Sequence, residues 1–309
     1  CCKNHDILTE NGWISVTELT MNHKVATLDK NENIIYNYPT HVYKYKNPWG
    51  KMYKLHSQQV DLIVTPNHRM YVKQRARVEG VDFGGNFELI EAEKCFGKRL
   101  KYKKDANEFI CDNYLEEFEL GDKKYNMKDW LLFFGIWYAE GCATGNYIHV
   151  CAHKERVKET LDEVLTNMGI EYKYQKCGTT KNMDIIIIRN KELFDYFRPL
   201  SVGAINKKLP EWVWQLKTEY CKILIEGLIL GDGYKNKSGV YLYYTSSENL
   251  ADDICRLSLH AGWSANIRSR KDIEKDTTFI IRNKQYRRNA DALELTINRY
   301  KNEPEVNHG

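Results

Sequence analysis

Residues 133–141 (FFGIWYAEG) and 225–233 (IEGLILGDG) are two copies of one pattern, an apolar run that ends in an acidic residue followed by glycine. The two acids, Glu140 and Asp232, are 92 residues apart. A segment repeated in this way is typical of a unit with approximate two-fold symmetry. We therefore expect one carboxylate from each copy to lie near the symmetry axis, where paired acids can hold a metal ion.

Small residues define one face of each repeated segment. Gly135 and Ala139 in the first copy, and Gly227 and Gly231 in the second, are spaced four residues apart. Such residues share a face of a helix, so the pattern predicts two helices whose backbones pack closely. The glycine after each acid is typical of a helix C-cap, which would place both carboxylates in the last turns of the paired helices.

Two acids at adjacent helix C-termini need a compensating cation, because the helix macrodipole disfavours negative charge there. Mg²⁺ is the natural candidate, since it prefers carboxylate oxygens and keeps room for water and phosphate. Glu140 and Asp232 are thus the predicted Mg²⁺ ligands. The simpler interpretation, two buried helices that each end in a solvated acid, accounts less well for two copies at matched spacing.

The repeated segments resemble the motif of the LAGLIDADG, or DOD-type, homing endonucleases. Residues 207–210 (KKLP) are similar to the K-x-[IL]-P element of that family, in which Lys207 matches by spacing and Lys208 is the alternative. Residues 245–253 (TSSENLADD) are similar to the start of the helix that follows the second motif in intein-borne members. The resemblance covers about residues 130–300.

The resemblance implies a two-repeat αββαββα domain over residues 129–300, with repeats at about 129–200 and 219–300. It also implies a Mg²⁺-dependent phosphodiester hydrolase that makes a double-strand break in DNA at a long, asymmetric site. Because both repeats lie in one chain, the endonuclease is expected to be monomeric.

The same resemblance implies catalytic roles for three residues. Glu140 and Asp232 hold the metal, and Lys207 offsets charge on the phosphate in the transition state. Tyr138 and Leu230 stand where the family motif has its first Asp. Neither replacement removes a metal ligand.

Basic residues are unevenly distributed, although the net charge is only +4. They cluster in the second half, next to the β-prone residues 277–281, and one further arginine follows the apolar run 185–188. Basic residues on strands are typical of a surface that lies along DNA phosphates. The predicted DNA-binding residues are Arg189, Arg268, Arg270, Lys271, Arg282, Lys284 and Arg287.

The first hundred residues show a different pattern, that of short strands. Residues 6–13 predict a strand entering a turn, residues 24–33 a strand with a hairpin, and residues 60–64 another strand. Residues 65–68 (TPNH) follow directly, and the chain opens on Cys1. In this order, the features resemble the all-β Hint splicing domain of inteins, which would cover residues 1–104.

This second resemblance implies an acyl shift. Cys1 would attack the carbonyl of the preceding residue and convert that peptide bond to a thioester. His68 would donate a proton to the departing nitrogen, and Thr65 would hold the geometry. Cys2 is the alternative nucleophile, with the same chemistry. The flanking host protein, or extein, is then the partner.

The remaining segments predict the organisation of the chain. A basic run at residues 98–104 gives way to acids at residues 112–122. Such charge blocks are typical of a solvated connector, which we expect at residues 105–128. Residues 301–309 predict a polar tail that leads toward a C-terminal splicing segment. That segment could be on a separate polypeptide, omitted from this sequence, or lost by degeneration. The predicted fold is therefore α+β, with an all-β splicing domain incomplete at its C-terminus and a two-repeat endonuclease.

The cysteine spacing and the hydropathy argue against a zinc-binding, a disulfide-stabilised or a membrane-spanning protein. None of the nine cysteines lies in a spacing typical of zinc or of a disulfide framework. No signal peptide or membrane-spanning apolar run is evident. We expect an intracellular protein, cytoplasmic or, in a eukaryotic host, nuclear.

Three interpretations remain open at this point. The first is an intein whose endonuclease is active. The second is a DNA- or RNA-binding protein of the maturase kind that no longer cleaves. The third is an inert remnant. Retention of both Glu140 and Asp232 favours the first.

Overall fold

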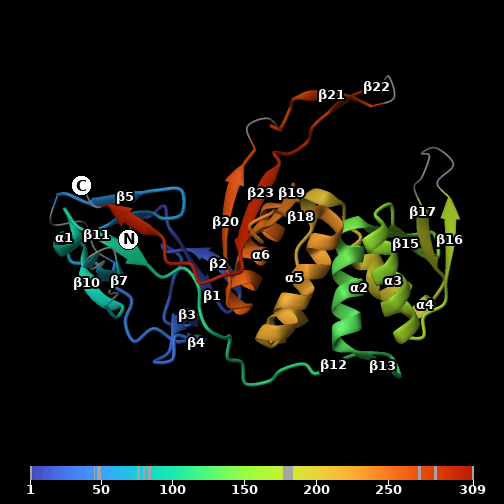
Figure 1. Ribbon diagram of the computed structural model, residues 1–309, viewed down its shortest axis with the longest axis horizontal. Coiled ribbons are helices and arrows are strands. Elements are labelled where there is room, and N and C mark those ends of the chain that lie inside the picture. Colours follow the sequence, from blue (N-terminus) through green and yellow to red (C-terminus); the bar gives the residue numbers. More distant parts are fainter. Residues whose placement is uncertain are drawn as a thin grey trace. The chain divides into compact units, whose positions relative to one another are not determined.

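The computed structural model describes residues 2–44, 46, 50–74, 77–78, 81–82, 85–176, 184–270, 273–281 and 284–307 (Figure 1). The chain forms two compact units. The first contains Cys1–Ile110, Gly262–Ser264 and Tyr300–Gly309, and the second contains Cys111–Ala261 and Ala265–Arg299. The first unit is thus assembled from segments that are far apart in the sequence.

The first unit is rich in β-structure. One antiparallel sheet has the order β2-β1-β3-β4, a second has the order β10-β7-β11-β24, and β5 and β6 form a separate hairpin, as do the two-residue strands β8 and β9. A single four-residue helix, α1 (Ala92–Cys95), occurs in the described part of this unit. The strands are β1 (Asp6–Thr9), β2 (Gly12–Ser15), β3 (Val25–Leu28), β4 (Ile34–Asn37), β5 (Tyr53–His56), β6 (Asp61–Val64), β7 (Arg69–Gln74), β8 (Arg77–Val78), β9 (Val81–Asp82), β10 (Glu88–Glu91), β11 (Arg99–Tyr102) and β24 (Glu305–Asn307).

The strands predicted near the N-terminus are confirmed, and the hairpin between β3 and β4 shows why the chain turns there. Val25 pairs with Asn37 and Leu28 with Ile34. The carboxylate of Asp29 accepts hydrogen bonds from the backbone of Asn31 at 2.8 Å and of Asn33 at 2.9 Å. In such an Asx turn, a side-chain oxygen takes the place of a backbone carbonyl as the hydrogen-bond acceptor.

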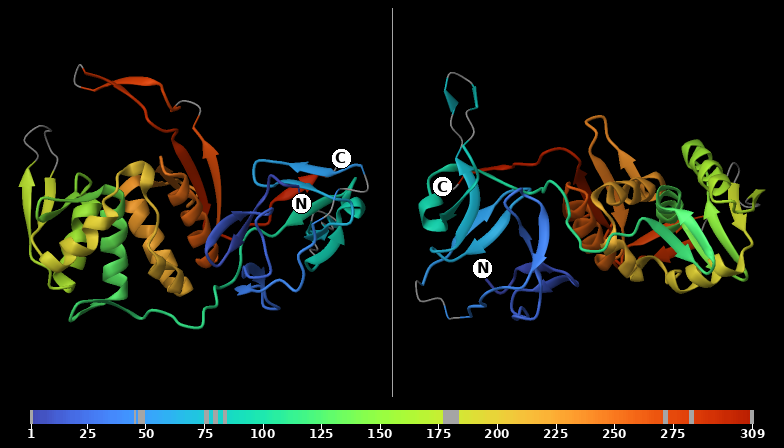
Figure 2. Two further views of the ribbon diagram at one scale, coloured as in Figure 1. Left: turned by 180° about the vertical axis from the view of Figure 1, so that it is seen from behind. Right: turned by 90° about the horizontal axis from the view of Figure 1, so that it is seen from below.

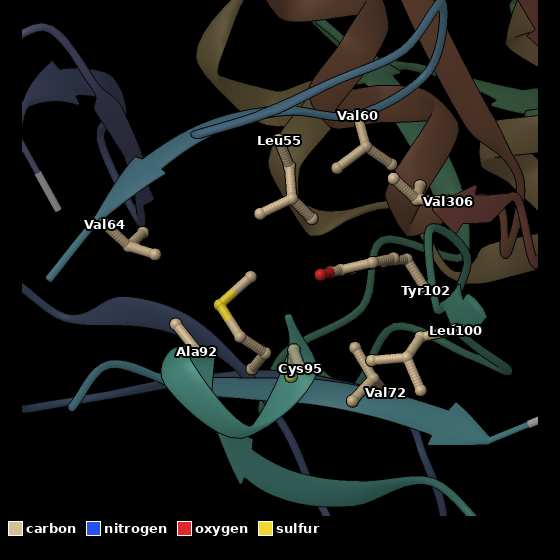
Figure 3. Packing of buried hydrophobic residues seen from close by; sticks show 10 residues of the cluster. Leu55, Val60, Val64, Val72, Ala92, Cys95, Leu100, Tyr102 and Val306 are labelled. Carbon is tan, nitrogen blue, oxygen red and sulfur yellow. The ribbon is translucent and has the colours of Figure 1, made fainter. Parts of the chain in front are cut away.

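The core of the first unit lies between the second sheet, α1 and the β5–β6 hairpin (Figure 3). It includes Leu55, Val64, Leu100 and Val306, which are almost completely buried. Val306 belongs to β24 and is paired with Leu100 of β11. Residues 305–307, which we expected to form part of a polar tail, therefore make an edge strand of the first unit.

The second unit contains both repeated segments (Figure 1). The first copy is α2 (Met127–Glu140), β14 (Gly141–Thr144), β15 (Tyr147–Cys151), α3 (Glu155–Asn167), β16 (Tyr172–Lys176), β17 (Asp184–Ile188) and α4 (Lys191–Phe197). The second copy begins with α5 (Thr218–Asp232), β18 (Gly233–Lys235), β19 (Tyr241–Thr245), α6 (Glu248–His260) and β20 (Ser264–Ser269), and ends with β23 (Leu293–Asn298). The sheets, β14-β15-β17-β16 and β18-β19-β23-β20, are equivalent in order.

The second copy differs from the first in two ways. The hairpin of β21 (Thr278–Ile281) and β22 (Lys284–Arg287) is inserted before β23 and projects beyond the sheet (Figures 1 and 2). In addition, the described residues after β23 contain no closing helix, since the chain returns to the first unit as β24. The order αββαββα thus describes the first copy, and the second departs from it.

The segment predicted as a connector is divided between the units. Residues 105–110 belong to the first unit, and β12 (Glu117–Leu120) and β13 (Lys123–Asn126) form a hairpin in the second. Phe118 of this hairpin stacks on Trp130 of α2, with 3.8 Å between ring centroids. Three short 3₁₀ turns, Arg198–Leu200, Ala204–Asn206 and Glu211–Gln215, connect the two copies. In the part of the chain that the structure describes, no helix could span a membrane.

Candidate active site

Helices α2 and α5 pack side by side, and their small residues make the contact (Figure 1). A methyl group at Gly135 would lie 2.8 Å from the backbone carbon of Gly227, which is far inside van der Waals contact. A methyl group at Gly231 would overlap the Cβ of Ala139. The predicted close approach of the two backbones is therefore confirmed.

The glycines after the acids occupy the predicted C-cap positions, where the backbone N–H of Gly141 donates to Trp137 and that of Gly233 donates to Ile229, and both glycines are needed for space. Gly141 and Gly233 have φ values of −108° and −121°, which are extended, and a strand begins at each of them. A Cβ at Gly233 would lie 2.6 Å from the Cα of Ile229, and one at Gly141 would overlap Trp137. The helix passes directly into the strand, and a side chain at the junction would meet the preceding turn.

The two acids end the paired helices. Glu140 is the last residue of α2, and Asp232 is the last residue of α5. The pKa of the Asp232 carboxyl is raised to about 6, mainly by burial and in addition by the charge of Glu140. Lys207 and Lys154 lower it. Two carboxylates that disfavour each other's charge in a partly buried site can be stabilised by a cation.

Lys207 lies at the end of α2. Its ammonium group donates to the carbonyl oxygen of Tyr138 at 2.6 Å and of Ala139 at 3.3 Å. Burial lowers the pKa of Lys207, while Asp232 and Glu140 act to raise it. The side chain of Lys208, by contrast, is exposed. Of the two lysines left open by the sequence, Lys207 is the one that the structure places beside the acids.

Lys154 is a second lysine at this site, and it was not predicted from the sequence. Its ammonium group donates to the carbonyl oxygen of Gly231 and lies 4.0 Å from Oε1 of Glu140. Lys154 precedes α3, 14 residues after Glu140, and no motif marks it. Each of the two lysines therefore bonds to the carbonyl that directly precedes one of the acids.

A different set of residues lines a pocket in the first unit. Thr65 and His68 contribute to this cavity of about 460 Å³, together with Val16, Thr17 and Asn67. The hydroxyl of Thr65 donates to the side-chain oxygen of Asn67 at 2.9 Å. Burial lowers the pKa of His68, and His5 acts in the same direction. The predicted nucleophile, Cys1, lies outside the described residues.

His5 anchors the N-terminal segment, which the sequence analysis did not recognise. Its Nε2 accepts a hydrogen bond from the backbone of Ile63 at 3.1 Å. Nδ1 must then carry the proton, and it lies 3.1 Å from both the carbonyl oxygen and the sulfur of Cys2. The backbone of Cys2 also donates to Ile63 at 3.0 Å. His5 thus holds the start of the chain against β6, which leads to Thr65.

We expect His5→Ala to destabilise the first unit by about 1–2 kcal/mol, because it leaves the Ile63 amide and the Cys2 carbonyl without this partner. Equilibrium denaturation monitored by fluorescence would measure the loss. His56→Ala is the matched control, since His56 and its partner Asp61 are both exposed. That exposed pair should contribute less than about 0.5 kcal/mol, and equal losses in both variants would contradict the anchoring role.

Part of the sequence matches a known protein family. Residues 219–297 match the family model described as "LAGLIDADG-like domain". The chain thus contains a LAGLIDADG-like stretch over these residues. The matched residues begin in α5, include Asp232 and end in β23.

Curated relatives match nearly the whole chain. It is 33% identical over 358 residues to the "DNA-directed RNA polymerase subunit beta C-terminal section" of Stigeoclonium helveticum, covering 99% of this chain and 32% of that protein. It is 36% identical over 287 residues to the "ATP-dependent Clp protease proteolytic subunit" of Chlamydomonas moewusii, covering 85% of this chain and 28% of that protein. The chain thus spans about a third of the length of these relatives.

A solved structure, that of I-DmoI in complex with DNA and Mn, is 12% identical. The match covers 55% of this chain and 88% of that one, with a TM-score of 0.36.

The structure places the predicted DNA-binding residue of the first copy beside aromatic side chains. Arg189 follows β17 and lines a cavity of about 830 Å³ with Tyr147, Tyr172 and Tyr174. The hydroxyls of Tyr172 and Tyr174 both donate to the carboxylate of Asp162, at 2.6 and 2.7 Å. These strand residues give the sheet of the first copy a mixed basic and aromatic surface.

In the second copy, two of the predicted arginines have acidic partners. Arg268 of β20 is 71% exposed and bonds to Glu294 at 2.6 Å, and Arg287 of β22 bonds to Asp276 at 3.0 Å. Arg270 lies over the ring of Tyr244, with 5.5 Å to its centroid. Lys271 and Arg282 lie outside the described residues, and Lys284 is described only by its backbone in β22.

The acidic side chains at the ends of α2 and α5 suit a hard divalent cation. No group of three or more His, Cys, Asp or Glu residues that could hold a metal occurs in the described ranges. A cage made by the described side chains alone is therefore absent. Mg²⁺ is commonly bound by one or two carboxylates together with water and substrate phosphate, and the two acids at the helix ends, Glu140 and Asp232, fit that pattern.

Proposed function

We propose that the chain is an intein, in which a splicing unit carries a site-specific LAGLIDADG DNA endonuclease. The observation that carries the endonuclease proposal is the arrangement at the paired helix ends, where Glu140 and Asp232 meet and each preceding carbonyl accepts from a lysine. An RNA polymerase subunit and a protease subunit share no activity, yet both match this chain over about a third of their length. A mobile insert accounts for such a shared segment.

In this proposal Glu140 and Asp232 hold one or more Mg²⁺ ions. When bound, Mg²⁺ supplies a Lewis acid for the phosphate oxygens and lowers the pKa of coordinated water. Lys207 and Lys154 add positive charge where negative charge develops on the phosphate. Partial burial of the site strengthens these interactions, because the effective dielectric constant is lower there.

The DNA substrate would lie along the two sheets of the domain. Arg189 with its neighbouring tyrosines serves the first copy, and the arginines of β20 and β22 serve the second. Both copies are present in one chain, so a monomer can present both half-sites. The two sheets carry different side chains, and we therefore propose a long and asymmetric double-stranded site.

The endonuclease proposal is tested by incubating the purified protein and Mg²⁺ with a fragment library of the encoding genome, from which the entire insertion that encodes residues 1–309 and any further intein residues has been removed and the flanks rejoined. Cleavage at the rejoined junction, with EDTA as the control, is the expected result. Retention of the junction DNA without cleavage would overturn the endonuclease proposal and favour a maturase-like binding protein. Neither binding nor cleavage would favour an inert remnant.

The first unit would carry out the acyl shift of protein splicing on the flanking host protein. The thiol of Cys1 gives its proton to solvent and forms a C–S bond with the preceding carbonyl carbon. The C–N bond breaks, and His68 gives a proton to the released nitrogen and regains one from solvent. Thr65 and Asn67 shape the pocket in which His68 lies. A C-terminal intein segment would complete the reaction.

Thiol-induced release tests this second activity. A reporter protein is fused before Cys1, and the fusion is incubated with an excess of a small thiol, which captures any thioester. Release of the reporter with a thioester-derived C-terminus, lost in Cys1→Ala and retained in Cys2→Ala, supports the proposal. Release that requires Cys2 instead would assign the nucleophile to that residue, and no release would overturn the splicing proposal.

A further inference from the structure

The segment 207–210 connects two 3₁₀ turns and has no regular secondary structure. Lys207 and Pro210 are both extended, with ψ values of 137° and 155°. In extended backbone, successive side chains point in opposite directions, which agrees with a half-buried Lys207, an exposed Lys208 and a buried Leu209. The backbone of this segment therefore decides which lysine faces the acids.

Side chains from two helices hold three consecutive backbone positions of this segment. The hydroxyl of Ser247, at the N-cap of α6, donates to the carbonyl oxygen of Lys207 at 2.6 Å. The hydroxyl of Tyr138 in α2 donates to the carbonyl oxygen of Lys208. The carboxylate of Asp253 in α6 accepts from the backbone amide of Leu209 at 2.7 Å. Backbone groups in an irregular segment need such partners.

Tyr138 contacts Lys207 in two further ways. Its carbonyl oxygen accepts the hydrogen bond from the Lys207 ammonium group, and its ring lies 5.6 Å from that group, within the range of a cation–π interaction. Its side chain is only 2% exposed. The second copy has Leu230 at the equivalent position, which offers no hydroxyl. The helix of the first copy alone can therefore hold the segment in this way.

We propose that Tyr138 and Asp253 are positioning residues for Lys207, which fix the backbone of residues 207–209 so that the ammonium group of Lys207 reaches the acids. Ser247 supports the same segment, but it also caps α6 by accepting from the backbone of Leu250 at 3.1 Å. This inference rests on the proposed endonuclease function. A misplacement of about 1 Å in a catalytic group can cost about a hundredfold in rate, so the hold on this segment affects catalysis directly.

Four variants test the proposal. Tyr138→Phe removes one hydroxyl, and Tyr125→Phe is its control, because the buried hydroxyl of Tyr125 has no hydrogen-bond partner among the described residues. Asp253→Ala removes the acceptor for Leu209, and Asp253→Asn restores an acceptor oxygen in a side chain of the same shape. Both pairs thus compare a lost hydrogen bond with a matched substitution that preserves the packing.

The first measurement needs no DNA and no metal. Each protein is reductively methylated, and mass spectrometry follows the reaction of Lys207 relative to Lys191, whose exposed side chain gives an internal reference. Lys207 should react several-fold faster in Tyr138→Phe and in Asp253→Ala, and at the unaltered rate in Tyr125→Phe and Asp253→Asn. Unchanged reactivity of Lys207 in Tyr138→Phe and Asp253→Ala would overturn the positioning role.

The second measurement is the single-turnover rate of cleavage on the junction DNA, at saturating protein and with the Kd for DNA measured separately. Tyr138→Phe and Asp253→Ala should each be about tenfold slower, the effect of one lost hydrogen bond of about 1.4 kcal/mol, with Kd changed less than twofold. A slower rate with unaltered Lys207 reactivity would also overturn the proposal. If Lys207→Met cleaves as fast as the unaltered protein, the catalytic role of Lys207 fails, while the labelling result still decides its placement.

Discussion

Asp232→Asn is expected to remove DNA cleavage and, at the same time, to make the second unit more stable at neutral pH. Burial and the charge of Glu140 raise the pKa of this carboxyl from 3.8 to about 6, so the folded state disfavours the ionised form. Asparagine has nearly the same shape and carries no charge. We expect cleavage to fall by about 100- to 1,000-fold, the effect of removing one electrostatic group from an active site.

The stability effect has a definite pH dependence. Because the folded pKa of Asp232 is above the unfolded value, its contribution favours folding below about pH 4 and is lost as the pH rises to about 6. The asparagine variant lacks this loss, so it should be more stable by about 1–3 kcal/mol at pH 7.5 and nearly equal at pH 4. Urea denaturation at both pH values measures the difference.

A matched control shows whether the changes in cleavage and stability are specific to Asp232 or follow from the loss of any negative charge. Asp195 of α4 is exposed and pairs with Lys191 one helical turn away. Asp195→Asn should leave cleavage unchanged and alter stability by less than about 0.5 kcal/mol. If Asp232→Asn still cleaved DNA, or proved less stable than the unaltered protein at pH 7.5, the paired-acid site would be excluded.

The features that depend on short stretches of sequence could be predicted. The spacing of Gly135 and Ala139 in one helix, and of Gly227 and Gly231 in the other, was sufficient to predict the contact face. The strands near the N-terminus followed from turn residues such as Asp29, whose side chain acts within four residues. In both cases the physical cause is local, and the sequence contains it.

Features that depend on distant parts of the chain were missed or mistaken. Lys154 reaches Gly231 across 77 residues, and the Lys207 segment depends on Tyr138 and Asp253. Nothing in the spacing of such residues predicts their contact, because it arises from the packing of the two copies. Residues 305–307 were assigned to a tail for the same reason, since the partner strand β11 lies some 200 residues earlier. The glycines after the acids were predicted as C-caps, but the close contacts that exclude a side chain there depend on the helix-to-strand junction and were not predicted.

Gly135→Ala is expected to separate the paired helices and to affect both stability and cleavage. The added methyl group would lie 2.8 Å from the backbone of Gly227 and of Leu228, and backbone atoms cannot move aside as a flexible side chain can. Alanine favours the helix by about 1 kcal/mol over glycine, but overpacking costs about 1–3 kcal/mol or more. Because the contact is with backbone, we expect a net loss near 2 kcal/mol.

The effect on cleavage follows from the geometry of α2 and α5. Both acids are terminal residues of these helices, so a shift of one helix changes the distance between Glu140 and Asp232. We expect at least a tenfold slower single-turnover rate, since about 1 Å of displacement suffices for this. Gly85→Ala in the first unit is the control, because no atom of the described residues other than its chain neighbours lies within 4 Å of the added group. The prediction would be contradicted if Gly135→Ala left both the cleavage rate and the stability in urea unchanged. Close packing of the glycines would then not determine the positions of the two acids.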